Sequence, residues 1–246
     1  LTANNLSGWL LYDYHNMNQM FWDTLGHIPN VTRPCWLWIP AQGSCILLVS
    51  YVDSGRFDLA VVEKLVFVSR QQMKQHLTKL LEGATEIAME YSPHGELPRV
   101  SRIDAGTLEL VRSIGVNVVS SGDLIQHATQ LWDAGQLDSH LKAANKLDVI
   151  VQEAFHYIGE TLDKGSSEQE VAEFIRCRFL EEGMEVSDGP VVAVNDHSSD
   201  PHFEPTIDNS RRIQLGDWIL IDLWSRLNGE SSIFADITWT AYVGPS

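Results

Sequence analysis

The most informative segment of the sequence is GDWILIDLWSRLNGESSIFADITWT, at residues 216–240. It contains two apolar runs typical of β-strands, and each run is interrupted by one carboxylate, Asp222 in the first and Asp236 in the second. The Asn-Gly pair between the runs is a strong signal for a β-hairpin turn. A turn centred near Gly229 puts both aspartates seven residues away from it. The sequence therefore predicts that Asp222 and Asp236 lie directly opposite each other on one face of a hairpin.

Two carboxylates that face each other on apolar strands need a physical reason to be there. Like charges at this spacing repel, and burial makes each charge more costly. The pair is stable if the two groups share a proton or if a cation lies between them. A single Asp in a strand usually points to solvent or bonds a backbone amide, but the matched distances favour a metal site. The same register would place Trp224 opposite Phe234.

A second candidate, His202, lies upstream in the loop SSDPHFEPT at residues 198–206, which is bounded by two prolines. A lone histidine in a loop is most often an ordinary surface residue. His140, His156 and His197 have no motif around them and are interpreted as structural. The local sequence alone thus leaves the role of His202 open.

The remaining chain predicts two domains. Strand-like and helix-like runs alternate through the first half, which indicates an α/β domain with helices packed on a sheet. From residue 136 onward, apolar residues recur every three or four positions as far as Leu162, which predicts an amphipathic helix of about seven turns. Ser167 and Glu170 have the spacing of a capping box at the start of the next helix. We place the boundary between residues 123 and 136, with domains at 1–130 and 131–246.

The charge of the chain limits the kinds of molecule that it is expected to bind. The chain has 33 acidic and 17 basic residues, which gives a net charge of −16. Such a surface repels phosphate backbones and anionic membranes, so we expect neither nucleic acid nor membrane as a partner. The three cysteines lack metal-type spacing, and their odd number argues against a disulfide framework, as expected for a cytoplasmic protein. No apolar run approaches the roughly 20 residues of a membrane span.

Three motifs taken in order resemble a known family. They are PHF at 201–203, GDWILID at 216–222 and ADITWT at 235–240. Together they are similar to the first half of the signature of the "pita-bread" metallopeptidases, which include Xaa-Pro aminopeptidase, prolidase and creatinase. YSP at 91–93 and VSRIDAGT at 100–107 resemble the N-terminal domain of the Xaa-Pro peptidase branch. The resemblance implies a creatinase-like α/β N-terminal domain followed by a partial α+β pita-bread catalytic domain.

The resemblance also implies roles for the three candidate residues. Asp222 and Asp236 would be the first two of five ligands to two divalent metal ions, with Asp236 bridging both ions. His202 would contact the substrate near the scissile carbonyl. The ions would activate water and polarise the carbonyl; manganese is expected first, with cobalt or zinc as alternatives. The implied activity is hydrolysis of the N-terminal Xaa-Pro bond of short proline-containing peptides by a homodimer.

The family takes its remaining ligands, one His and two Glu, from the second half of its catalytic domain. No positions for them follow Ser246. Two ligands out of five hold a dinuclear centre poorly, so we expect this chain by itself to be inactive. Two alternatives stay open: a creatinase-like C–N hydrolase or small-molecule lyase on the same fold, and a non-catalytic binding or dimerisation module.

Overall fold

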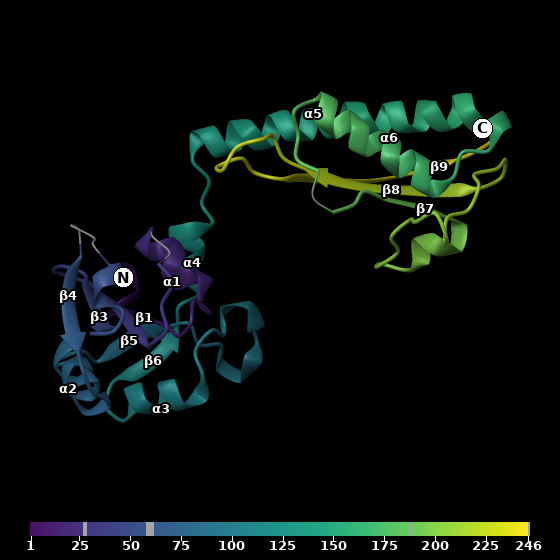
Figure 1. Ribbon diagram of the computed structural model, residues 1–246. Coiled ribbons are helices and arrows are strands. Elements are labelled where there is room, and N and C mark those ends of the chain that lie inside the picture. The colour runs from purple at the N-terminus through teal and green to yellow at the C-terminus, as the bar shows by residue number, and fades with distance from the viewer. Residues whose placement is uncertain (27–28, 58–61, 187, 246) are drawn as a thin grey trace. The chain divides into compact units, whose positions relative to one another are not determined.

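The computed structural model describes residues 1–26, 29–57, 62–186 and 188–245. It divides into two compact units, Leu1–Leu131 and Trp132–Ser246. This division lies one residue from the predicted one. Figure 1 shows both units.

Unit 1 is built on a six-stranded mixed sheet with the strand order β4-β3-β2-β1-β5-β6. The pairs β1–β2 and β2–β3 are antiparallel, and the other three pairs are parallel. The strands are β1 (Gly8–Asp13), β2 (Cys35–Pro40), β3 (Ile46–Ser50), β4 (Glu63–Phe67), β5 (Glu86–Met89) and β6 (Asn117–Ser120). The helices are α1 (Gln19–Leu25), α2 (Arg70–Leu80), α3 (Ala105–Arg112) and α4 (Gly122–Thr129).

Both faces of this sheet are covered, because successive residues of its central strands point to opposite sides. Leu11 belongs to the apolar cluster that includes Phe21 of α1 and Ile125 of α4. Leu10, the residue before it, belongs to the cluster that includes Leu77 of α2. The uninterrupted apolar runs of β1 and β2 are therefore explained by burial on both faces.

Unit 2 is a three-stranded antiparallel sheet with two helices. The strand order is β7-β8-β9, and Figure 1 shows α5 and α6 together over one face of the sheet. The elements are α5 (Ala134–Thr161), α6 (Glu168–Glu181), β7 (Val191–Val194), β8 (Trp218–Ser225) and β9 (Ala235–Tyr242). The predicted capping box of Ser167 and Glu170 is confirmed at the start of α6. Asp133 and Gln136 form a second capping box, which the sequence analysis missed, at the start of α5.

The alternation of β8 separates a covered face from an open one. Ile219, Ile221 and Leu223 are buried in a cluster with residues of α5 and α6. The residues between them, including Asp222, are only half-buried and point to the other side. The fold thus leaves one face of the sheet open, and the first predicted carboxylate lies on it.

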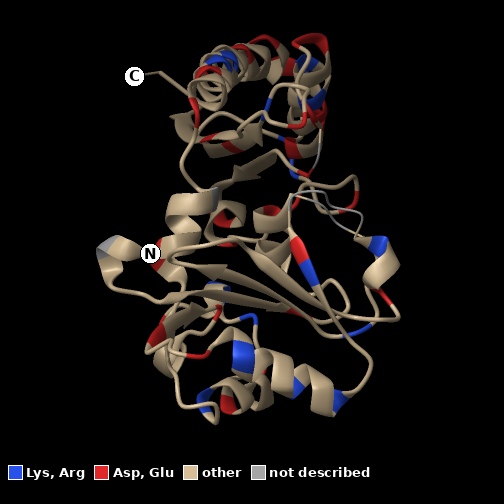
Figure 2. Cartoon of the chain, turned by 90° about the vertical axis from the view of Figure 1, so that its left-hand side faces the viewer, with Lys and Arg blue, Asp and Glu red and all other residues tan. Residues whose placement is uncertain are grey.

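Charge is distributed over both units. Asp and Glu positions lie on many helices and loops and outnumber those of Lys and Arg (Figure 2). Within the described ranges, no helix combines the length and apolar character needed to cross a membrane.

Candidate active site

The two predicted carboxylates share a face but are not directly opposite. Asp222 pairs with Thr238, and Asp236 pairs with Trp224. Because paired residues of antiparallel strands point to the same side, and Asp236 is two residues from Thr238, both aspartates lie on the open face as diagonal neighbours. The predicted direct pairing of Asp222 with Asp236 is wrong, and so is the pairing of Trp224 with Phe234.

The offset has its origin in the connection between the strands. The register pairs are centred on residue 230, as 222 with 238 shows, rather than on Gly229. β8 ends at Ser225 and β9 begins at Ala235, so the Asn-Gly pair does not form a tight two-residue turn. Instead, Asn228 donates its backbone N–H to the carbonyl of Gly183, just beyond α6. The connection between the strands is therefore tied to the segment after α6, a contact that no local motif reveals.

Thr238, a residue of the ADITWT motif, contacts the carboxylate of the neighbouring strand. Its hydroxyl donates a hydrogen bond of 2.5 Å to Oδ1 of Asp222, the residue opposite. The bond leaves the second oxygen, Oδ2, available and orients the carboxylate. The Thr238 hydroxyl, two residues after Asp236, thus orients Asp222 rather than Asp236. Groups that hydrogen-bond to metal ligands commonly have this effect.

The two carboxylates interact electrostatically. The pKa of Asp236 is raised from its ordinary value, first because the surrounding protein removes part of its hydration and second because of the negative charge of Asp222. Asp236 is nevertheless an exposed residue, so the site is accessible from solvent. A hard divalent cation between the two groups would relieve this repulsion, and oxygen ligands of this kind suit it. The chemistry of the pair therefore fits a metal site. The pair would be only part of such a site, because the described residues contain no group of three or more His, Cys, Asp or Glu able to hold an ion.

His202 lies on an exposed loop that follows the 3₁₀ turn η6 (Asn195–Ser199). Its backbone N–H donates to Oδ1 of Asp200 at 2.9 Å. Figure 1 shows the segment after β7 on the side of the sheet away from α5 and α6, which is the side of the open face. The participation of His202 in a site with the two aspartates remains a prediction.

Aromatic side chains flank the carboxylates on the open face. Trp218 and Tyr242 face each other with ring centroids 5.4 Å apart. The Trp224 ring packs against Gly189, where an added Cβ would lie 2.5 Å from the ring and where φ is +77°. Glycine is required at this position both by the backbone conformation and by the close approach. The open face is thus a carboxylate pair between apolar walls.

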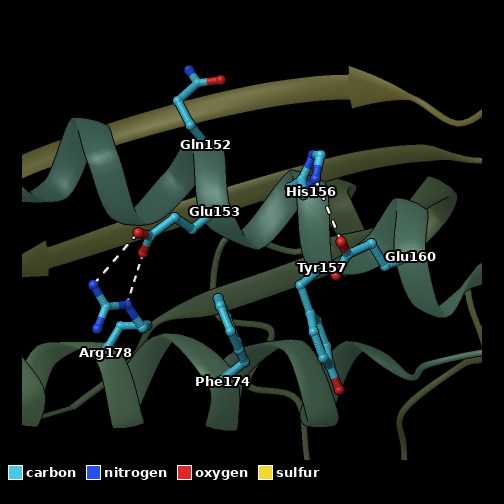
Figure 3. Close-up of a pocket in the computed structure, with 7 residues that line it drawn as sticks. All are labelled: Gln152, Glu153, His156, Tyr157, Glu160, Phe174 and Arg178. Carbon is cyan, nitrogen blue, oxygen red and sulfur yellow. Dashed lines mark hydrogen bonds and ion pairs between the residues drawn. The ribbon is translucent and has the colours of Figure 1, made fainter.

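A groove of about 620 Å³ lies elsewhere in unit 2, between α5 and α6 (Figure 3). Glu153 in this groove pairs with Arg178 at 2.7 Å, and Tyr157 stacks on Phe174 with ring centroids 4.6 Å apart. Since the groove is in the helix layer, the sheet separates it from the aspartates. Its paired charges and stacked rings are explained by helix packing.

Comparison with known proteins gives one family match, and it lies in unit 2. The model of metallopeptidase family M24 matches residues 139–246. The matched residues include both open-face aspartates, and this family implies divalent metal ions. A comparison with curated protein sequences gave no match.

The fold is also that of solved peptidase structures. The dipeptidase PepE from Mycobacterium ulcerans superposes with a TM-score of 0.63 at 21% identity, over 99% of this chain and 62% of that one. A recombinant prolidase from Thermococcus sibiricus gives 0.58 at 20% identity, over 99% and 63%. A Xaa-Pro dipeptidase from Bacillus anthracis gives 0.58 at 14% identity, over 99% and 62%. The chain thus spans less than two thirds of each, and the predicted fold, an α/β domain followed by a partial pita-bread domain, is confirmed.

Sequence reasoning missed two contacts within unit 2. The Thr238 hydroxyl was recognised only as part of a motif, and its partner became clear from the register. His197 was interpreted as structural, yet it forms a hydrogen bond with Glu168, 29 residues earlier. No spacing rule joins these two positions, because tertiary packing alone brings them together.

Proposed function

We propose that the M24 protein containing these residues hydrolyses the N-terminal Xaa-Pro bond of short peptides with the help of two divalent metal ions, manganese first. The observation that carries the proposal is the placement of Asp222 and Asp236 on one open face of an M24 domain. Solved structures of similar fold, a dipeptidase, a prolidase and a Xaa-Pro dipeptidase, support the substrate class. As a homodimer in the cytoplasm, such an enzyme would meet proline-containing peptides from protein turnover.

The proposal gives each residue of the site a task. Asp222 and Asp236 would hold divalent ions, and Thr238 keeps the Asp222 carboxylate oriented. Metal held there would supply positive charge to polarise the scissile carbonyl and lower the pKa of water. His202 lies near that carbonyl and donates a hydrogen bond to the charge that develops on its oxygen. The aromatic walls exclude water from around the peptide, which strengthens these interactions.

The proposal is tested by comparing two proteins. We expect the 246-residue chain to release no proline from an Ala-Pro dipeptide in the presence of Mn²⁺, because two carboxylates without further ligands hold metal weakly. A longer protein that adds the second half of the M24 domain is expected to release proline, and to stop when a chelator or Asp236→Asn is introduced.

Each outcome has a distinct meaning. Turnover by the 246-residue chain that a chelator abolishes would show that the missing ligands are dispensable. A longer protein that binds Mn²⁺ yet cleaves no Xaa-Pro peptide would overturn the proposed substrate, and hydrolysis of creatine instead would support the C–N hydrolase alternative. A longer protein that binds no metal would leave only the non-catalytic module.

A further inference from the structure

The loop that carries His202, residues 195–205, is held to the rest of unit 2 by polar contacts at several points. At its beginning, Asn195 adopts a left-handed backbone conformation with φ of 52°. Its side chain accepts the backbone N–H of Trp218 at 2.9 Å and donates to Oδ1 of Asp217 at 2.8 Å. The loop is thereby tied to the start of β8, the strand that carries Asp222.

A second anchor is the carboxylate of Glu168, the first residue of α6, which is completely buried. Its Oε1 accepts the backbone N–H of Val194 at 2.7 Å, and its Oε2 accepts that of Arg211 at 2.8 Å. The start of a helix favours a negative charge, and the two N–H groups replace water around it. One side chain thus joins α6, the end of β7 and the segment that leads to β8.

His197 completes this arrangement from within the loop. Its Nδ1 lies 2.8 Å from Oε1 and 3.0 Å from Oε2 of Glu168. Since both oxygens belong to an acceptor, Nδ1 carries the hydrogen and donates it. The other side of the imidazole packs against Phe203, with ring centroids 4.2 Å apart, and Phe203 is buried directly after His202. The charged groups near the ring are Glu168, to which it is hydrogen-bonded, and an ion pair between Asp196 of the loop and Arg211 of the segment that follows it.

We propose that His197 is a positioning residue for His202. The Nδ1–H bond to Glu168 holds the imidazole in place, the imidazole supports Phe203, and Phe203 fixes the backbone that presents His202 on the open side of the sheet. His197 itself touches neither metal nor substrate in this role. The role of His202 rests on the proposed function, whereas the ordering of its loop is a property of the chain that is measured independently.

Substitutions at position 197 separate the hydrogen bond from the ring contact. His197→Phe keeps an aromatic ring against Phe203 but places a carbon where Nδ1 donates. His197→Asn loses the ring but places its amide nitrogen, also bonded to Cγ, at the position of Nδ1. Hydrogen exchange of peptides covering residues 195–206 reports loop order, since the amides of Asp200 and Phe203 are hydrogen-bonded within it. Peptides from α5 serve as the internal control, and the His202 ring signals in an NMR spectrum report its environment.

We expect His197→Phe to accelerate exchange in the loop by about tenfold or more, the effect of losing one hydrogen bond to a charged group, with α5 unchanged. His197→Asn keeps a donor but loses the ring against Phe203, so its loop exchange should lie between that of the original chain and that of His197→Ala, which loses both. His197→Ala also replaces the phenylalanine chain if that chain does not fold. Loop exchange that stays unchanged in His197→Phe, or that is as fast in His197→Asn as in His197→Ala, overturns the proposal. Neither peptide nor metal is used, so inactivity of the longer protein would remove the proposed function and leave this result standing.

Discussion

At the scale of single residues, the candidate site is a pair of carboxylates whose negative charges repel each other. Asp236 is exposed, yet the charge of Asp222 contributes to raising its pKa. Asp222 in turn is stabilised by the Thr238 hydroxyl. The arrangement is one that a cation between the two groups would stabilise and that two bare carboxylates only tolerate.

Removing one charge should therefore relax the other group. We expect Asp222→Asn to lower the pKa of Asp236 toward its ordinary value, because the repulsion that disfavours the charged form is gone. A pH titration of the side-chain carboxyl ¹³C signals measures this pKa. Asp208→Asn, an exposed change in a loop, is the control and should leave it unchanged. A pKa of Asp236 that is identical in the Asp222→Asn chain would show that the two groups do not interact.

At the scale of elements, buried carboxylates connect segments that are distant in the sequence. In unit 1, Glu90 is completely buried at the end of β5. It accepts hydrogen bonds from Trp9 Nε1 at 2.6 Å, Asn18 Nδ2 at 3.0 Å and Ser121 Oγ at 3.2 Å. It thus joins β1, β5 and the starts of α1 and α4. Burial outweighs these bonds and raises the pKa of Glu90 to about 7.

This pKa predicts how stability depends on pH. Between the unfolded value of 4.5 and about 7 the folded state binds the proton that the unfolded state has lost, so the contribution of Glu90 to stability falls as pH rises and levels off above about 7. The full change is roughly 3 kcal/mol. We expect Glu90→Gln to remove this contribution, so that the difference in unfolding free energy between the two proteins changes between pH 4.5 and 7. Urea unfolding across this range measures it.

The matched control for that experiment is Glu82→Gln, which changes an exposed carboxylate just after α2. Its pH profile should run parallel to that of the original chain. A Glu90→Gln profile that is also parallel would contradict the raised pKa, since the two proteins would then differ by a constant free energy at every pH.

At the scale of the whole molecule, the chain has two compact units with separate apolar cores. Leu77 is buried in a cluster of unit 1, and Leu147 of α5 is buried in the cluster of unit 2. Each unit has its own sheet, and no strand pairs across the division in the described part of the chain. The units therefore have the organisation expected of two independently packed domains.

We expect a cavity in one core to destabilise that unit selectively. Leu147→Ala should lower the stability of unit 2 by about 2–5 kcal/mol, and Leu77→Ala should do the same in unit 1. Hydrogen exchange by mass spectrometry assigns the effect, because peptides from residues 132–245 should respond to the first change and peptides from residues 1–131 to the second. Equal acceleration on both sides of residue 131 by either substitution would show one cooperative unit instead of two.

Much of this architecture was predictable from local patterns. The strands and helices, the division near residue 130 and the α6 capping box follow from periodicity and from capping and turn chemistry, which act over a few residues. The shared face of Asp222 and Asp236 was also predictable, because a face depends only on whether the register shifts by an even number of residues. The observed offset of two residues preserves that face.

The register, and the partners of buried polar groups, became clear from the tertiary structure. The bond from Asn228 to Gly183 ties the connection between β8 and β9 to the segment after α6. The bonds of Glu168 to His197 and of Glu90 to Trp9 join residues 29 and 81 positions apart. These contacts form because a buried carboxylate must find donors wherever packing supplies them. Sequence spacing predicts interactions within one segment. The donors to buried carboxylates come from other segments, which meet only when the chain has folded.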